Sequence, residues 1–584
     1  MIARMGQWVV GMLSALVLSV LPVQAVERIC SVYMESPSSL QMQVQLASQV
    51  FEAPELGMFP MMMTMMVPGG SQVNMSEPVS LHVFDIGGGR TAGLVELTPA
   101  TTAEMFLKSL TAASGVPLVP AVDGRYTFEG GVAQVRGARL LLAKTAAELD
   151  ACTGGAVPAL PPMPAIPGVI RVAMAPAAVV PMLDGMKAQC VSAMAAGGPD
   201  AAQAQDMMEM VFGLYTRTLA QINTLNIGIA VQPEGLLMRS QIVPVSGSTV
   251  AGILATMQPA DPSHLSFVQK GTLFAMASGA YTLPDQLKQQ LVSLYIEMIK
   301  TSPQAAGIDT AELSFAMRES IESLGASMAW SGEMTPDGKS FLMQGAMGIV
   351  PAVSYLEKMV ALSNLPAMKA LTSQSGVRIG EAGKRMYKDY PVYHWSFSMD
   401  EAALRKQMGA GAQDMDENAF AAVSRMMQVF GSGYDYAATP KGVTFGLGST
   451  SMVEQASDRL MADGADVSES ARIRTLLSPA SAPVALGRFG LLDAVRTGAR
   501  MATEVAGAPL PAAVAALPAG EGIVFADWIT GSEVNSALLI PASDIKALSH
   551  MAKSMQAAAQ ATAMEEEEAV IEELPVEEAV AEEK

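Results

Sequence analysis

The chain is poor in charged residues, in aromatic residues and in cysteine. Only 16% of its 584 residues are charged and 5% are aromatic, whereas 50% are hydrophobic. This composition excludes a mainly disordered chain, which would be rich in charge and poor in apolar residues. Lys and Arg number 36 against 56 Asp and Glu, for a net charge of −20. Such a balance argues against binding to nucleic-acid phosphates, which needs clustered basic residues.

The sequence also lacks the motifs of the common enzyme classes. It contains no CxxC, no GxGxxG after a predicted strand, no Walker loop and no GxSxG elbow. The four histidines are far apart in sequence, without metal-ligand spacing. Ser543 and Lys546 fit an SxxK pattern, but its companion motifs are missing, and Ser543 is well placed to cap a helix. The sequence therefore favours a non-catalytic protein and leaves an enzyme of unrecognised type as the alternative.

Long apolar runs are absent except at the N-terminus. Arg4 precedes an apolar run from Trp8 to Leu21, and Val23-Gln24-Ala25 provides a small-x-small cleavage site. This arrangement is typical of a secretory signal peptide, here residues 1–25. No later run reaches the roughly 18 apolar residues that span a bilayer. We therefore expect an exported protein of the periplasm, cell surface or medium, without a transmembrane segment after signal removal.

The scarce cysteines fit an exported protein with one disulfide. In an oxidising compartment, two of Cys30, Cys152 and Cys190 can pair and one is left over. We predict a Cys30–Cys152 bridge because these two residues bracket the first predicted domain. A Cys152–Cys190 bridge is the alternative.

Internal repetition is the most informative feature that is present. Two alternating apolar segments, Leu225–Val231 and Leu236–Val243, flank the turn Pro233-Glu234-Gly235. Glycine supplies the positive φ of a tight hairpin turn, and alternation buries one face of each strand. Similar hairpins are predicted at 81–99, 326–351 and 523–541, and another around 440–442. A short strand and a longer helical region precede each hairpin, and helical spacing follows it.

We therefore predict an α+β fold of tandem strand–helix–hairpin–helix repeats in an elongated or arc-shaped molecule. The predicted divisions are a signal peptide at 1–25, an N-terminal α+β domain at 26–155, a proline-rich linker at 156–168, repeats at 169–260, 261–365, 366–465 and 466–563, and an acidic disordered tail at 564–584.

This order of hairpins and helices resembles a loosely defined group of exported bacterial proteins of unknown function. Those proteins repeat a β-hairpin–helix domain behind a signal peptide. The resemblance covers most of the chain and rests on the pattern, since no single motif residue is diagnostic. It implies the architecture and assigns no catalytic residue.

A methionine-rich segment is the first candidate site. Thioethers are soft ligands that suit Cu(I). With 44 methionines in the chain, however, methionine is better interpreted as a pliable apolar residue, and we expect no cofactor. The candidate copper ligands are Met58, Met61, Met62, Met63, Met65 and Met66.

The second candidate is the basic and aromatic stretch from Lys384 to Trp395. Aromatic faces stack on sugars, while Lys and Arg attract carboxylate or phosphate groups. An anionic glycan or envelope polymer would fit such a surface, whereas a plain hairpin with exposed Tyr and Lys is the alternative. The candidate ligand-binding residues are Arg385, Tyr387, Lys388, Tyr393 and Trp395.

Taken together, these features favour a non-catalytic binding or scaffold protein of the bacterial periplasm or cell surface. Low charge and abundant methionine suit an apolar groove for a ligand or partner. The partner would be an envelope protein, a lipid or a glycan, and not a nucleic acid. The alternative function is a hydrolase of envelope polymers.

Overall fold

The computed structural model describes residues 27–572 with several interruptions. Outside the described residues lie 1–26, 59–71, 86–90, 112–117, 121–123, 129–130, 154–162, 181–182, 184–186, 188–189, 191–211, 302–308, 322, 336–339, 375–376, 381–382, 400–432, 463–466, 507–508 and 573–584. The predicted signal peptide is therefore outside them. Within the part that is described, no helix has both the length and the apolar character needed to cross a membrane.

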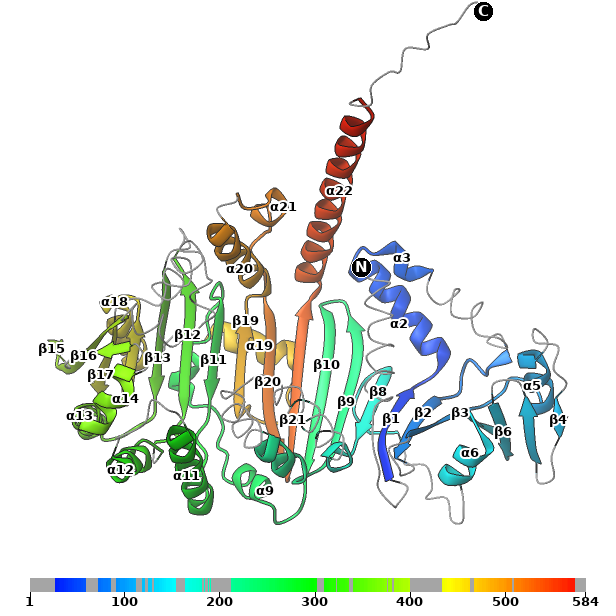
Figure 1. Ribbon diagram of the computed structural model, residues 1–584, viewed down its shortest axis with the longest axis horizontal. Coiled ribbons are helices and arrows are strands. Elements are labelled where there is room, and N and C mark those ends of the chain that lie inside the picture. The colour runs from blue at the N-terminus through cyan, green and yellow to red at the C-terminus, as the bar shows by residue number, and fades with distance from the viewer. Residues whose placement is uncertain are drawn as a thin grey trace, which may run out of the picture.

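The described strands join into one antiparallel sheet (Figure 1). Most of them form three-strand sets in which a single strand pairs with the first strand of the following hairpin. Set I is β1 (Glu27–Met34), β2 (Val79–Asp85) and β3 (Thr91–Leu97); set II is β8 (Ile170–Met174), β9 (Ile222–Gln232) and β10 (Gly235–Pro244); set III is β11 (Phe274–Ser278), β12 (Met328–Met334) and β13 (Phe341–Met347); set IV is β16 (Tyr390–Met399), β17 (Gly433–Thr439) and β18 (Gly442–Leu447); set V is β19 (Ala485–Phe489), β20 (Ile523–Thr530) and β21 (Glu533–Pro541).

The sets are not joined in chain order. The first strands of sets I and II pair with each other, as β1 with β8, and the third strands of sets II and V pair as β10 with β21. The first strands of sets V and III then pair as β19 with β11, and the third strands of sets III and IV as β13 with β18. The C-terminal set V therefore lies in the middle of the sheet, between sets II and III (Figure 1).

Shorter strands complete the two ends of the sheet. Beside set I lie β7 (Arg139–Ala143), β6 (Gly131–Arg136), β5 (Arg125–Phe128) and β4 (Val119–Pro120). Beside set IV lie β14 (Val377–Ile379) and β15 (Gly383–Tyr387), which both pair with β16. Lys384 and Arg385 on this last edge discourage pairing with another chain.

The predicted fold class, an α+β array of tandem strand–helix–hairpin–helix modules in an elongated or arc-shaped molecule, is wrong. Hairpins do form at indicated positions, as β9–β10 and β20–β21 show, but all sets belong to one continuous antiparallel sheet. Each set alone would leave two edges with unpaired backbone groups, and pairing between sets satisfies them. Sequence periodicity shows which residues form a strand, and it does not show which edges meet.

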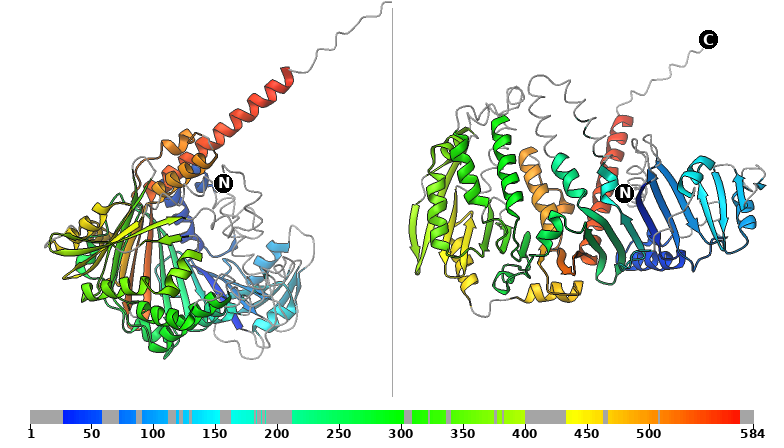
Figure 2. Two further views of the ribbon diagram at one scale, coloured as in Figure 1. Left: turned by 60° about the vertical axis from the view of Figure 1, so that its left-hand side comes forward. Right: turned by 90° about the horizontal axis from the view of Figure 1, so that it is seen from below.

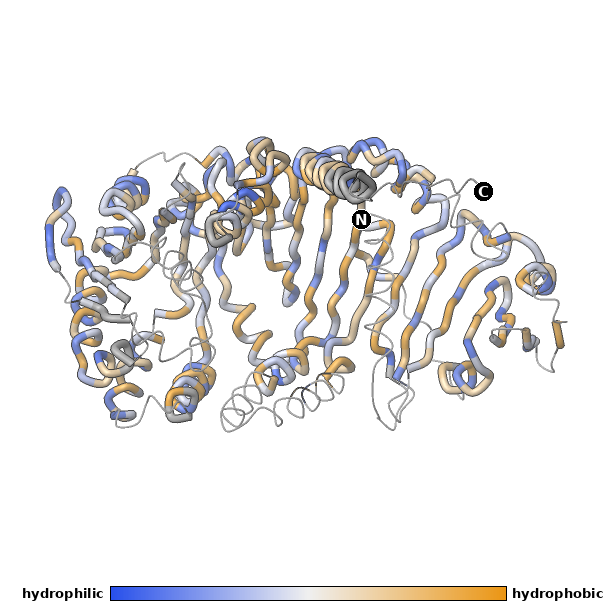
Figure 3. Tube along the Cα trace, turned by 45° about the horizontal axis from the view of Figure 1, so that its top comes forward, coloured by the Kyte–Doolittle hydropathy of each residue, from blue (hydrophilic) through white to orange (hydrophobic). Residues whose placement is uncertain are grey.

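Helices gather along the two borders where the strands end (Figures 1 and 3). Toward one border lie α2 (Pro37–Val50), α3 (Pro54–Gly57), α20 (Leu491–Ala506), α21 (Ala512–Ala515) and the start of α22 (Ala542–Glu572). Toward the other lie α6 (Ala146–Thr153), α9 (Thr249–Leu254), α11 (Asp285–Thr301) and α12 (Thr310–Ile321). The other described helices include α5 (Ala103–Thr111), η3 (Pro176–Val179), α13 (Ala352–Ser363) and α14 (Pro366–Gln374).

Helix α22 projects away from the body of the molecule (Figure 2). Its first turns pack against α20 and α21, where Leu548 and Met551 belong to one apolar cluster with Leu492 and Val514. From residue 553 to 561 its side chains are exposed. The helix continues to Glu572, so the segment predicted as an acidic tail from 564 begins as helix.

The main core lies on one face of sets II, V and III, which we call the packed face. Helices α10 (Pro262–Leu265), α18 (Thr450–Met461) and α19 (Ser468–Leu477) cover this face. Leu460 and Ile473 from these helices pack on the sheet, and each such buried side chain stabilises the fold by about 1.5–3 kcal/mol. The sheet residues of this core are Leu237, Ala275, Ala277, Ala329, Ala346, Leu486, Val524, Ala526, Trp528, Ala537 and Leu539.

Candidate functional site

The opposite face of sets II, V and III, which we call the open face, is apolar and only half-buried. Strand β20 shows the alternation: Val524 and Ala526 are buried on the packed face, whereas Ile523 and Phe525 point to the open face and are half-buried. Strand β11 alternates in the same way. Two large side chains at the open face, Met328 and Phe489, are 38% and 40% exposed.

One continuous row of the open face can be followed through the strand register. Its members face each other across neighbouring strands from β9 to β18, and apart from two glycines all of them are large and apolar. The row consists of Ile229, Met238, Leu538, Phe525, Gly487, Met276, Trp330, Gly345 and Phe445. The open face is therefore a broad apolar floor assembled from four of the five sets.

Aromatic rings lie over glycines on this floor. A Cβ atom at Gly487 would be 2.7 Å from Phe525 Cζ, and one at Gly345 would be 2.3 Å from Phe445 Cζ. A Cβ at Gly332 would be 2.5 Å from Phe274 Cζ. Because glycine has no side chain, each ring occupies the space over its neighbour's backbone.

This patterning differs from that of an ordinary solvated sheet. Antiparallel sheets with one face in water alternate apolar and polar residues, whereas strands covered on both faces are apolar throughout. The run Ile523-Val524-Phe525-Ala526 is of the second kind, and it was the signal in the sequence that could have indicated this face. Yet the open face retains exposed apolar area, which makes it a candidate binding surface.

A short polar row crosses the apolar floor. Asp527 of β20 is opposite Ser536 of β21, which is opposite Ser240 of β10, and all three are half-buried. Burial raises the pKa of Asp527, and a hydrogen bond from Ser536 opposes this rise in part. Among the residues that the structure describes, no cation forms an ion pair with Asp527.

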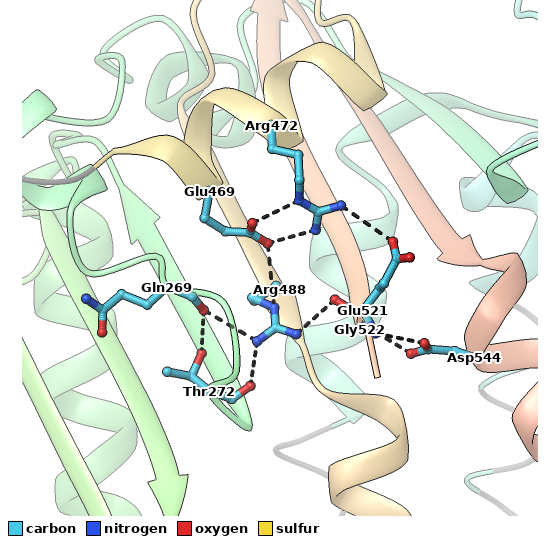
Figure 4. Close-up of polar contacts among 8 residues, drawn as sticks. All are labelled: Gln269, Thr272, Glu469, Arg472, Arg488, Glu521, Gly522 and Asp544. Atoms are coloured by element: carbon cyan, nitrogen blue, oxygen red, sulfur yellow. Dashed lines mark hydrogen bonds and ion pairs between the residues drawn. The ribbon is translucent and has the colours of Figure 1, made fainter. Parts of the chain in front are cut away.

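A buried polar network occupies the packed face (Figure 4). Arg488 of β19, with a fully buried side chain, donates from Nη1 to Thr272 O at 2.9 Å and from Nη2 to Glu521 O at 2.8 Å. Its Nε lies 3.8 Å from Glu469 Oε1. Arg472 holds the same carboxylate through two hydrogen bonds of 2.8 Å.

The network extends to the start of α22. Asp544, which is fully buried, accepts hydrogen bonds of 2.9 Å from the backbone N–H groups of Glu521 and Gly522 (Figure 4). Burial alone would raise the pKa of Glu469, but the hydrogen bond and charge of Arg472, with the charge of Arg488, hold it below its usual value. Because its charged groups bind one another and nearby backbone, we interpret the network as a structural junction.

Among the described residues, His82 and His394 are the histidines whose ring nitrogens have hydrogen-bonding partners. His82 is buried, its Nδ1 lying 2.7 Å from Ser31 Oγ and its Nε2 2.8 Å from Ser80 Oγ. Both ring nitrogens are thereby occupied, so His82 is not available to a substrate. His394 is 43% exposed at its side chain, and its Nδ1 lies 2.8 Å from Asp435 Oδ1. Among the described residues, no serine or threonine hydroxyl that could act as a nucleophile is hydrogen-bonded to His394.

The sequence-predicted glycan site is divided in the structure. Arg385 pairs with Glu454 at 2.7 Å, and both Lys388 and Tyr387 bind Asp458. The other two candidates, Tyr393 and Trp395, are 4% and 5% exposed and pack beneath α13 with Leu356, Tyr434 and Tyr436. Glycan binding by these residues stays a prediction, and the aromatic faces on which it relied are buried.

The predicted copper site falls mostly outside the described residues. Met58 ends α3 and is 61% exposed, whereas Met61, Met62, Met63, Met65 and Met66 lie outside them. Copper binding therefore stays a prediction. Across the described ranges, His, Cys, Asp and Glu form no cluster that could hold a metal ion.

The predicted Cys30–Cys152 disulfide is not formed, because all three cysteines are free thiols. Cys30 packs against Val83 and Cys152 against Phe84. Val83 and Phe84 are neighbours in β2 and point to opposite faces of the sheet, so the two thiols lie on opposite sides. The alternative bridge to Cys190 is absent as well. Burial, with a smaller contribution from Glu148, raises the pKa of Cys152 to about 11.

Comparison of the chain with known proteins gave no matching family model, no matching curated protein and no matching solved structure. Function is therefore inferred from the open face.

Proposed function

We propose that the protein is a non-catalytic exported binding protein of the bacterial envelope, and that it carries an apolar ligand on its open face. The observation that supports this most strongly is the row of half-buried apolar side chains from Ile229 to Phe445 across neighbouring strands. Export itself is inferred from the sequence of residues 1–25.

The free energy of apolar surface gives the physical reason. Removing apolar surface from water stabilises a protein by about 25 cal/mol per Å². The open face leaves such surface exposed at Met328 and Phe489 and half-covered at Phe525 and Trp330. A bound apolar ligand would cover this surface and so recover that free energy. Methionine at positions such as Met238 and Met276 adapts to ligands of different shapes.

A charge placed on the floor tests the proposal. The variant Phe525→Glu should abolish binding of the neutral apolar dye N-phenylnaphthylamine, measured by its fluorescence increase, because the carboxylate would be desolvated beneath the dye. The matched control is Phe315→Glu, since Phe315 is 56% exposed on α12, away from the open face. We expect this control to bind like the unmodified protein. Equal binding by both variants, or no binding by the unmodified protein, would contradict the proposal.

A further inference from the structure

Asp527 is a carboxylate set into an otherwise apolar surface. It is half-buried on the open face, two residues beyond Phe525 along β20. Asp527 therefore lies next to the row that contains Phe525 and Leu538, on the same face of the sheet. Its described partner is the hydroxyl of Ser536, a neutral group. A desolvated carboxylate is costly unless it is paired with a cation or hydrogen-bonded by several donors. Among the described residues, the position therefore has no counter-charge that would stabilise it.

The surroundings of Asp527 indicate which kind of molecule could carry a cation to this carboxylate. On one side, the apolar floor continues through Leu538 and Met238. On the other side, it continues through Met276 to Trp330, three strands from β20. At a strand spacing of about 4.8 Å, this second part of the floor extends about 14 Å across the strands from β20. The space suits an extended alkyl chain better than a second polar molecule.

We infer that the open face binds an amphiphile that has a protonated amine at one end and an alkyl chain at the other. The ammonium group binds Asp527, with the hydroxyls of Ser536 and Ser240 beside it as acceptors, and the chain lies on the apolar floor. This inference rests on the proposed function and specifies its ligand class. A carboxylate head would be repelled by Asp527, and an alcohol head would donate a hydrogen bond to the carboxylate without forming an ion pair.

The test compares three ligands that share one chain and differ only in their heads: dodecylamine, dodecanol and dodecanoate. Each is titrated calorimetrically, below its micelle-forming concentration, into the full mature chain. The unmodified protein should bind dodecylamine about tenfold more tightly than dodecanol, because only the ammonium head adds an ion pair to its hydrogen bond with the carboxylate. Dodecanoate should bind the most weakly.

The decisive variant is Asp527→Asn, which keeps the shape of the side chain and removes its charge. It should lose the preference for dodecylamine over dodecanol, because its amide oxygen accepts a hydrogen bond from either head without forming an ion pair. The control is Asp389→Asn, which changes an exposed acid in the turn between β15 and β16 and should preserve the preference. Thermal unfolding of each variant checks that it is folded; an Asp527→Asn protein that fails to fold is replaced by Asp527→Ser with the same expectation.

The outcomes separate the inference from the proposed function. Tight binding of all three ligands with no preference, or an undiminished preference in Asp527→Asn, overturns the inference and leaves apolar binding intact. Absence of binding by dodecanol and dodecylamine alike overturns the proposed function, and the inference with it. A preference for the amine that disappears in Asp527→Asn and persists in Asp389→Asn supports both.

Discussion

At the scale of single residues, burial determines what the ionisable side chains do. His82 lies within hydrogen-bonding distance of Ser31 and Ser80 and is fully buried. Desolvation lowers its pKa from 6.5 to about 4, against the opposing attraction of Glu96. The folded protein therefore keeps His82 neutral at a pH at which an unfolded chain would protonate it.

This difference predicts a pH dependence of stability. Because the unfolded state binds the extra proton between pH 6.5 and about 4, stability falls as the pH is lowered through this window and levels off below it. The loss due to His82 should be about 3 kcal/mol. Thermal unfolding between pH 7.5 and 4 should show a smaller decrease in Tm for His82→Gln than for the unmodified protein. Parallel curves would contradict the assignment.

The sequence could reveal little of this residue chemistry. His82, Ser31 and Glu96 are isolated polar residues in apolar strands, and only the pairing of β1, β2 and β3 brings them together. The same limit explains the cysteine error. Spacing along the chain suggested that Cys30 and Cys152 could meet, and the alternation of β2 placed them on opposite faces. Asp527 could likewise not be recognised as a candidate site residue from the sequence, because its apolar surroundings come from neighbouring strands.

At the scale of elements, the network around Arg488 connects set V to its neighbours. Its guanidinium binds backbone of the loop before β11, the loop before β20 and the carboxylate of Glu469 on α19. Asp544 attaches the start of α22 to the same loop before β20. Helix α19 and set V are thus held by charge-assisted contacts in addition to the apolar core beneath them.

Removal of this arginine should be costly. Arg488→Met leaves Glu469 with one cationic partner fewer and the carbonyls of Thr272 and Glu521 without this donor, so we expect a loss of about 3–5 kcal/mol in unfolding free energy. Arg125→Met breaks a partly exposed pair with Asp150 and should cost at most about 1 kcal/mol. Urea-induced unfolding compares the two. A cost for Arg488→Met no larger than that for the control would show that the network contributes little.

The individual elements were largely predictable, whereas their contacts were not. Alternation and the turn glycines located β9, β10, β20 and β21 correctly. Gly235 shows why such a turn needs glycine: its φ is 149°, and a Cβ there would be 2.0 Å from Ile540 O. That close approach belongs to the junction between sets II and V, which the local pattern did not indicate.

At the scale of the whole molecule, the order of the sets creates the candidate site. Set V is last in the chain and lies between sets II and III in the sheet. The residues around Asp527 therefore come from segments about Ser240, Met276, Trp330 and Leu538, and they form one surface only when set V is in place. An interpretation of the chain as consecutive domains does not predict a surface to which sets II, III and V all contribute.

The central claim, that the open face binds an apolar ligand, is tested most directly by photo-crosslinking. The mature protein is irradiated with a diazirine-bearing long-chain alcohol, and the labelled residues are identified by peptide mapping. We predict adducts concentrated on open-face residues such as Met238, Phe525, Leu538 and Trp330, and their loss when unlabelled dodecanol competes. Adducts confined to other surfaces such as α22, or labelling that dodecanol does not displace, would contradict the account.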